Sequence, residues 1–163
     1  MTVIIREYTE KDLAELIEIW NEVVEAGIAF PQMENLTKTQ AAILFSEQSF
    51  TGTAVNRDTG EVLGLYILHP NNIGRCGHIA NASYAVRSRA RGFKIGEKMV
   101  RHSIEKCKEL GFRILQFNAV VRTNHSAIHI YEKLGFVKLG IIPGGFLMKD
   151  GTFEDIVPFY RAL

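Results

Sequence analysis

The chain has few cysteines, and this scarcity excludes the classes of protein that depend on them. Only Cys76 and Cys107 occur among 163 residues. Two cysteines do not make a disulfide framework, and because no C-x-x-C pair is present, zinc ribbons and thioredoxin-type redox sites lack their usual signature. This cysteine usage favours a reducing, intracellular compartment.

Long apolar runs and an excess of charge of either sign are also missing. No segment approaches the roughly 18 apolar residues of a transmembrane helix, and Arg6 follows the start too closely for a signal peptide. Lys and Arg number 19 against 18 for Asp and Glu, so the net charge is +1, which excludes a strongly basic nucleic-acid-binding protein. We therefore expect a soluble, cytoplasmic protein with no nucleic-acid or membrane partner.

The composition that remains is that of an ordinary globular protein. Apolar residues make up 47% of the chain and charged residues 23%. A domain typically has about 100–200 residues, and a chain of this length buries a core without disulfides. Because no repeat or linker divides the sequence, we expect one domain over residues 1–163.

Hydrophobic periodicity predicts how strands and helices alternate. Strands are predicted over residues 3–7, 50–56, 61–69, 76–86, 113–120, 136–142 and 153–160, and helices over residues 10–25, 38–47, 95–110 and 125–134. Pro143-Gly144-Gly145 is typical of a turn, and Pro158 indicates a sheet edge or rim. The order βααβββαβαββ predicts an α/β (α+β) fold, with a mixed sheet of about seven strands and helices on both faces.

A basic loop between a predicted strand and the helix at 95–110 has the composition of an anion site. Amide groups at a helix N-terminus attract anions, and Gly92 and Gly96 allow close approach of the main chain. Six cations fall within fifteen residues: Arg87, Arg89, Arg91, Lys94, Lys98 and Arg101. The loop matches neither the P-loop nor the dinucleotide motif, so a solvated basic turn remains an alternative.

A second motif lies downstream, where Asn124-x-x-Ala127-x-x-x-Tyr131 is followed by Gly135-Phe136. With Arg91-Gly92-x-x-Ile95-Gly96, this sequence resembles the GNAT superfamily of acetyl-CoA-dependent N-acetyltransferases along essentially its whole length. The resemblance implies the GNAT fold, acetyl-CoA as cosubstrate, no metal, a small-molecule amine acceptor and, by analogy, a homodimer. Lys94 departs from the family's pattern, which has glycine at that position.

The resemblance is closer to the branch of this superfamily that acetylates azetidine-2-carboxylate, a proline analogue. It is carried by the segments 78–84, 111–118 and 134–136 and by Pro143-Gly144, while residues 25–30 are similar to the phosphinothricin and methionine-sulfoximine acetyltransferases. It implies that Asn81 and Asn118 bind a small amino-acid acceptor and that Asn124 lies near the thioester. Asparagine is disfavoured in strands, so the alternative for Asn81 and Asn118 is a structural side-chain hydrogen bond or an outward-facing position.

The resemblance also assigns the cofactor site and the remaining catalytic groups. Tyr131 is expected to protonate the leaving thiolate, or else to be an inward aromatic of an amphipathic helix. The main-chain N–H of Val86 is expected to donate to the oxyanion, beside the catalytic Asn81 and Asn124. Acetyl-CoA is expected to contact Tyr84, Ala85, Val86, Arg91, Gly92, Phe93, Lys94, Ile95, Gly96, Asn124, Ala127 and Tyr131.

Three functions follow from these residues. The first is N-acetylation of a small amino acid or toxic amino-acid analogue by direct attack in a ternary complex. The others are a non-catalytic acetyl-CoA-binding module and a protein or peptide N-acetyltransferase. No carboxylate stands out as a general base, so a water chain is expected to take the amine proton. His125 and His129 lie four residues apart but lack the Glu of H-E-x-x-H, which disfavours a metal.

Overall fold

The computed structural model describes residues 1–163 and consists of one mixed sheet with two helices on each face. The elements are β1 (Val3–Glu7), α1 (Leu13–Ala26), α2 (Lys38–Ser46), β2 (Phe50–Asn56), β3 (Val62–Pro70), β4 (Ile79–Val86), α3 (Ile95–Glu109), β5 (Ile114–Val121), α4 (His125–Lys133), β6 (Val137–Lys138), β7 (Ile142–Leu147) and β8 (Phe153–Ala162). Short 3₁₀ turns precede α1, β4 and α3. None of the helices is long and apolar enough to cross a membrane.

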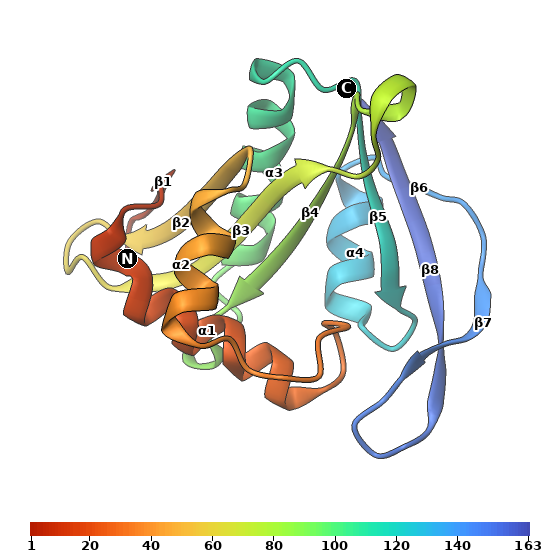
Figure 1. Ribbon diagram of the computed structural model, residues 1–163, viewed down its shortest axis with the longest axis horizontal. Coiled ribbons are helices and arrows are strands. Elements are labelled where there is room, and N and C mark those ends of the chain that lie inside the picture. The colour runs from red at the N-terminus through yellow and green to blue at the C-terminus, as the bar shows by residue number, and fades with distance from the viewer.

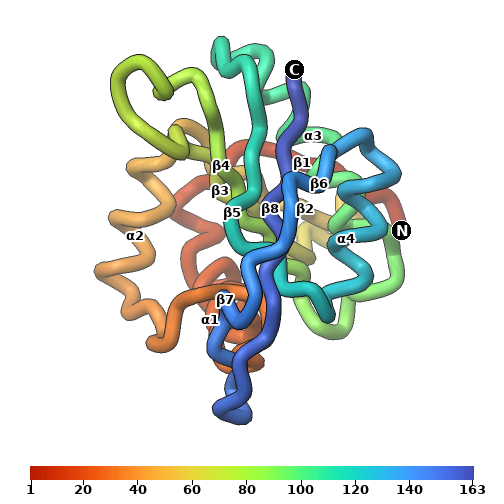
Figure 2. Tube along the Cα trace, turned by 90° about the vertical axis from the view of Figure 1, so that its right-hand side faces the viewer, coloured from red at the N-terminus to blue at the C-terminus, as the bar shows by residue number.

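The sheet has the strand order β1-β2-β3-β4-β5-β8-β6, and β7 also pairs with β8. Every neighbouring pair is antiparallel except β4 and β5, which run parallel. Helices α1 and α2 cover the face towards the viewer in Figure 1, and α3 and α4 cover the other. Figure 2, turned by 90°, shows α2 and α4 on opposite sides of the sheet. The predicted mixed sheet with helices on both faces is confirmed.

Each face of the sheet has its own apolar core, because side chains of a strand alternate between faces. On one face, Trp20 and its neighbours on α1 pack against α2 and the sheet, and the Trp20 ring lies tilted against Phe30 at a centroid distance of 4.7 Å. On the other, Met99 and the inner stripe of α3 pack with the aromatic side chains of β5 and β8. Cys107 is fully buried there. Two helical layers thus hold β3, β4 and β5 between them.

Two predicted strands have different bounds in the structure. The strand expected over residues 76–86 begins at Ile79, because Gly74–Cys76 form a 3₁₀ turn. The strand expected over residues 136–142 is reduced to β6, which has only two residues. The turn expected at residues 143–145 lies inside β7, where the register with β8 shifts between Ile142 and Phe146.

Pro158 explains the shortness of β6 and corrects the expectation that it marks a sheet edge. Its strand, β8, is internal, with β5 on one side and β6 and β7 on the other. Leu139 donates its N–H to the Pro158 carbonyl at 2.9 Å, but proline has no N–H with which to return the bond. The β6–β8 ladder therefore stops at this point, and the missing donor lies at the gap between β6 and β7.

Candidate active site

Strands β4 and β5 diverge in the middle of the sheet and open a wedge. Their parallel pairing covers only Ile79–Asn81 and Ile114–Gln116, although β4 continues to Val86. Figure 1 shows the two strands together at the top and separated below. We call the paired end the apex of the wedge.

The hydrogen-bond parity of β4 shows which main-chain groups face the wedge. The Arg87 N–H donates to the Leu63 carbonyl at 2.9 Å, and the Asn71 N–H donates to the Ile79 carbonyl at 2.7 Å. These bonds bracket the β3–β4 ladder, so the odd-numbered residues of β4 bond to β3. The even-numbered residues face β5, and beyond the paired segment Tyr84 and Val86 have no strand to pair with. Ala85, which the sequence assigned to cofactor binding, bonds to β3.

The loop before α3 presents a continuous row of unpaired amides at the wide end of the wedge. The Arg91 N–H bonds to the Ser88 carbonyl and the Lys98 N–H to the Lys94 carbonyl. Every main-chain N–H between them, from Gly92 to Glu97, donates no bond within the protein. Such amides at the N-terminus of a helix bind phosphate.

Lys94 has an uncommon backbone conformation in this loop. Its φ of 60° and ψ of 21° are left-handed, and it is the one non-glycine residue with positive φ in the protein. Gly92, two residues earlier, also has a positive φ, of 88°. Lysine therefore occupies a position that favours glycine, with its side chain exposed to solvent.

The structure corrects the expectation that six cations converge on this loop. Arg87 is buried on the opposite face, where it donates to the Val62 carbonyl at 2.9 Å and to Glu15 and Glu18 at 3.2 Å each. Arg89 pairs with Glu61, and Arg101 pairs with Glu97. Three cations without an ion-pair partner remain for an anion: Arg91, Lys94 and Lys98.

The acidic residue in the first turn of α3 does not oppose an anion. Glu97 accepts hydrogen bonds from Lys133 at 2.8 Å and from Arg101 at 2.8 Å. These two cations lower the pKa of the Glu97 carboxyl to about 2. The carboxylate is thereby neutralised locally, and it ties α3 to the end of α4.

Tyr131 lies in an aromatic cluster beneath the wedge. Its ring packs on Phe117 and Phe136, with centroid distances of 4.4 and 5.6 Å. Its hydroxyl makes no hydrogen bond within the protein, yet solvent reaches it, and burial raises the pKa of the phenol. Tyr84 is different, because its hydroxyl bonds to Ser103 at 2.7 Å. The geometry is compatible with both interpretations of Tyr131, because its ring packs inward in the core while its hydroxyl is free to donate a proton to the thiolate.

Asn124 forms the N-cap of α4. Its side-chain oxygen accepts from the Ala127 N–H at 3.4 Å and from the Ser126 hydroxyl at 3.2 Å. Its side-chain amide has no partner in the protein and remains available as a donor. Asn124 and the half-buried Ala127 thus occupy the start of the helix that carries Tyr131.

Asn81 and Asn118 lie on the other face of the sheet, beside α1 and α2. The Asn81 side-chain amide donates to the Gln116 carbonyl at 2.9 Å and so joins β4 to β5 at the apex. Gln116 donates to the Asn118 side-chain oxygen at 3.0 Å, and Asn118 donates to Asn71 at 2.6 Å. The predicted asparagines therefore belong to one row of neutral amides. Sequence reasoning missed Gln116 and Asn71, because strand register alone brings them together.

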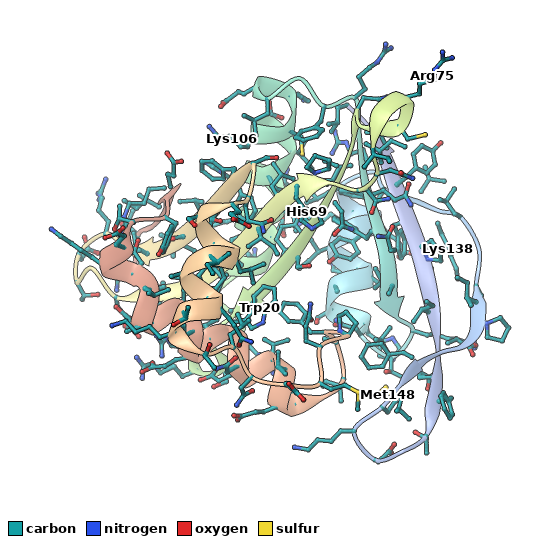
Figure 3. The ribbon with its side chains drawn as sticks, viewed as in Figure 1. Trp20, His69, Arg75, Lys106, Lys138 and Met148 are labelled. Atoms are coloured by element: carbon teal, nitrogen blue, oxygen red, sulfur yellow. The ribbon has the colours of Figure 1, made fainter.

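Two segments that are distant in sequence meet on the α1 side of the sheet. Lys149, in the β7–β8 hairpin, donates its main-chain N–H to the Gly27 carbonyl at 2.9 Å and its ammonium to the Glu25 carbonyl at 2.7 Å. Figure 3 shows the neighbouring Met148 beside the connection between α1 and α2. We call this contact the rim bridge.

A split parallel strand pair beside a helix that presents free amides fits an extended ligand with an anionic end. The chain matches the acetyltransferase (GNAT) family over residues 13–136, and it belongs to that family.

Known proteins with similar sequences and structures agree with this. N-acetyltransferase aca1 of Schizosaccharomyces pombe is 28% identical over 148 residues, which are 82% of this chain and 71% of that protein. A GCN5-related N-acetyltransferase from Kribbella flavida superposes with a TM-score of 0.92 at 32% identity, covering 99% of this chain and 98% of its own. A phosphinothricin acetyltransferase from Sinorhizobium meliloti, solved with acetyl-CoA, has a TM-score of 0.91 at 24% identity, covering 100% and 89%.

The chain is therefore an acetyl-CoA-dependent N-acetyltransferase of the GNAT fold. Its own residues fit the cosubstrate. The amides from Gly92 to Glu97 and the unpaired cations suit a diphosphate, and the open N–H groups of β4 suit an extended amide-bearing arm. Acetyl-CoA supplies the activated acetyl group, and an amine accepts it.

Proposed function

We propose that this enzyme acetylates the amine of a small amino acid or a toxic amino-acid analogue, and that residues 1–163 act as a single N-acetyltransferase domain. The rim bridge carries the proposal. It joins two segments on the same side of the sheet as the amide row through bonds of 2.7 and 2.9 Å. An acceptor that threads through an open groove, such as a peptide, would have to break this contact, whereas a free amino acid would not.

The chemistry of the amide face supports the same class of acceptor. Asn81 and Asn118 present neutral donors and acceptors. Such groups suit the closely spaced amine and carboxylate of an amino acid, which would otherwise need two opposite charges from the protein. The resemblance to the azetidine-2-carboxylate branch points to these two residues as the acceptor-binding pair.

The amine attacks the thioester carbonyl in a ternary complex. The C–N bond forms as the C–S bond breaks, the amine loses a proton to water at the amide face, and the thiolate gains one. The Tyr131 hydroxyl is the proposed donor, because it makes no hydrogen bond within the protein and a phenol is protonated at neutral pH. Asn124 is proposed to contact the cosubstrate arm through its unengaged amide.

The open N–H groups of β4 are proposed to bind the thioester carbonyl and the arm that leads to it. Val86 was expected to donate to the oxyanion, but it lies beside the anion loop. Residues in a strand are about 3.3 Å apart, so Tyr84 lies deeper in the wedge, closer to the amide row. We therefore propose Tyr84 as the oxyanion donor and Val86 as a contact of the arm.

Thiol release from acetyl-CoA tests the proposal. The acceptor panel comprises azetidine-2-carboxylate, phosphinothricin, methionine sulfoximine, common amino acids, polyamines and peptides. We expect turnover with one or more of the first four classes and none with peptides. Asn81→Ala should raise the acceptor KM, whereas Asn72→Ala, an exposed amide outside the row, should not.

Two results would overturn the proposal. Tight acetyl-CoA binding without thiol release from any acceptor would identify a non-catalytic binding module. Preferential turnover of peptides would identify a protein or peptide acetyltransferase and would contradict the reading of the rim bridge.

A further inference from the structure

Strand β5 has no register partner on either side at Asn118, a member of the amide row. Its pairing with β4 stops at Gln116. Its pairing with β8 on the other edge is interrupted by a register shift between Phe117 and Val120. Asn118 lies in this interval and has no register partner in either neighbouring strand.

Two hydrogen bonds hold the Asn118 side chain. Its oxygen accepts from Gln116 of the same strand at 3.0 Å, and its amide donates to the Asn71 side-chain oxygen at 2.6 Å. Asn118 is exposed, so without these bonds its carboxamide would rotate freely. Asn71 supplies the one bond that comes from outside β5.

Asn71 is itself firmly placed. It follows β3 directly, and its main-chain N–H donates to the Ile79 carbonyl at 2.7 Å, which extends the β3–β4 ladder by one residue. Arg75, labelled in Figure 3, marks the same β3–β4 connection at the apex end of the sheet. The Asn71 side chain is half-buried, whereas the neighbouring Asn72 is exposed and accepts only from Ile73 beside it.

We propose that Asn71 is a positioning residue for the acetyl acceptor, acting through Asn118. It orients the Asn118 carboxamide at the point where β5 has no register partner on either side, and thereby sets which amide groups face the acceptor. The effect on the acceptor rests on the proposed function, because Asn118 is there the acceptor-binding residue. The orientation of Asn118 itself does not rest on it.

Steady-state kinetics with azetidine-2-carboxylate and phosphinothricin test the proposal. Asn71→Ala removes the bond and should raise the acceptor KM by about two- to tenfold, the effect of one hydrogen bond, with the acetyl-CoA KM unchanged. Asn71→Asp keeps an acceptor oxygen and should restore most of the loss. The matched control Asn72→Ala should behave as the wild type.

A double variant separates action through Asn118 from a general effect on folding. If Asn71 acts through Asn118, then Asn71→Ala combined with Asn118→Ala has the acceptor KM of Asn118→Ala alone. Multiplied effects, or a wild-type KM for Asn71→Ala, would overturn the proposal.

A spectroscopic measurement distinguishes failure of this inference from failure of the proposed function. The Asn118 side-chain NH₂ signals in ¹H–¹⁵N spectra should move and exchange faster with water in Asn71→Ala but not in Asn72→Ala. If no acceptor in the panel turns over, the proposed function fails while this readout still decides the orientation. Unchanged Asn118 signals would refute it.

Discussion

The left-handed backbone of Lys94 makes a prediction whose sign depends on the conformation of the anion loop. In an ordinary helical conformation, replacing alanine by glycine costs about 1 kcal/mol. In the left-handed region an L-residue costs about 1–2 kcal/mol that glycine does not. Glycine at position 94 should therefore stabilise the protein where it would normally destabilise it.

The magnitude follows from two opposing contributions. Relief of the left-handed strain contributes about 1–2 kcal/mol, and the greater freedom of glycine in the unfolded chain offsets about 0.5–1 kcal/mol. Lys94 makes no ion pair and its side chain is exposed, so little contact is lost. We expect Lys94→Gly to be more stable than Lys94→Ala by about 0.5–1 kcal/mol, or about 1–4 °C in Tm.

Denaturation of the wild type and both variants, without acetyl-CoA, measures the difference. Lys94→Ala keeps the strain and should lie within about 0.5 kcal/mol of the wild type. Both variants lose the same ammonium group, so they should bind acetyl-CoA with Kd values within about twofold of each other. If Lys94→Gly is the less stable of the two by about 1 kcal/mol, the left-handed conformation and the reasoning built on it are refuted.

Three further predictions concern other parts of the protein. Arg87→Ala should lose about 2–3 kcal/mol of stability, since it removes charged hydrogen bonds at a buried site, and its acetyl-CoA Kd should be unchanged. Arg91→Ala should instead weaken acetyl-CoA binding and keep the stability of the wild type. Denaturation measures the stabilities and calorimetric titration measures the Kd values. Burial acts to raise the pKa of Asp12, but hydrogen bonds from Arg6 outweigh it and the pKa is lowered. The wild type should therefore be more stable than Asp12→Asn, with the full difference above about pH 4 and a shrinking difference below it. Urea midpoints of both proteins across this pH range would show the change. Tyr131→Phe should retain its Tm and lose about 100-fold in kcat if the hydroxyl protonates the thiolate; an unchanged kcat would leave Tyr131 a packing role alone.

Much of this fold was accessible from sequence because its longest elements have strong periodicity. The stripe of apolar residues on α1 and its termination at Gly27 are visible in the sequence, and the structure has them in place. The region from residue 136 to 147 was not accessible. There, the ladder stops because Pro158, far along the chain, lacks an N–H. No local pattern at residues 136–142 contains that information.

The candidate site shows the same division. The loop glycines and the helix that follows them were evident from their order, whereas the side on which each arginine lies was not. Arg87 carries the same charge as Arg91, but it faces α1 and its acidic residues. The sequence predicted Asn81 and Asn118 of the amide row but not Asn71. Asn71 and Asn118 are 47 residues apart and meet only through strand register.

The divergence of β4 and β5 leaves the sheet as two halves joined by three residue pairs. A cosubstrate arm lying in the wedge would contact both β4 and β5, so it would link the two halves while bound and leave them unlinked when it dissociates. At a concentration about 100 times its Kd, such a ligand adds about 2.7 kcal/mol to the free energy of unfolding. Because proteases degrade opened states, the lifetime of this enzyme in a cell should lengthen when acetyl-CoA is plentiful and shorten under starvation.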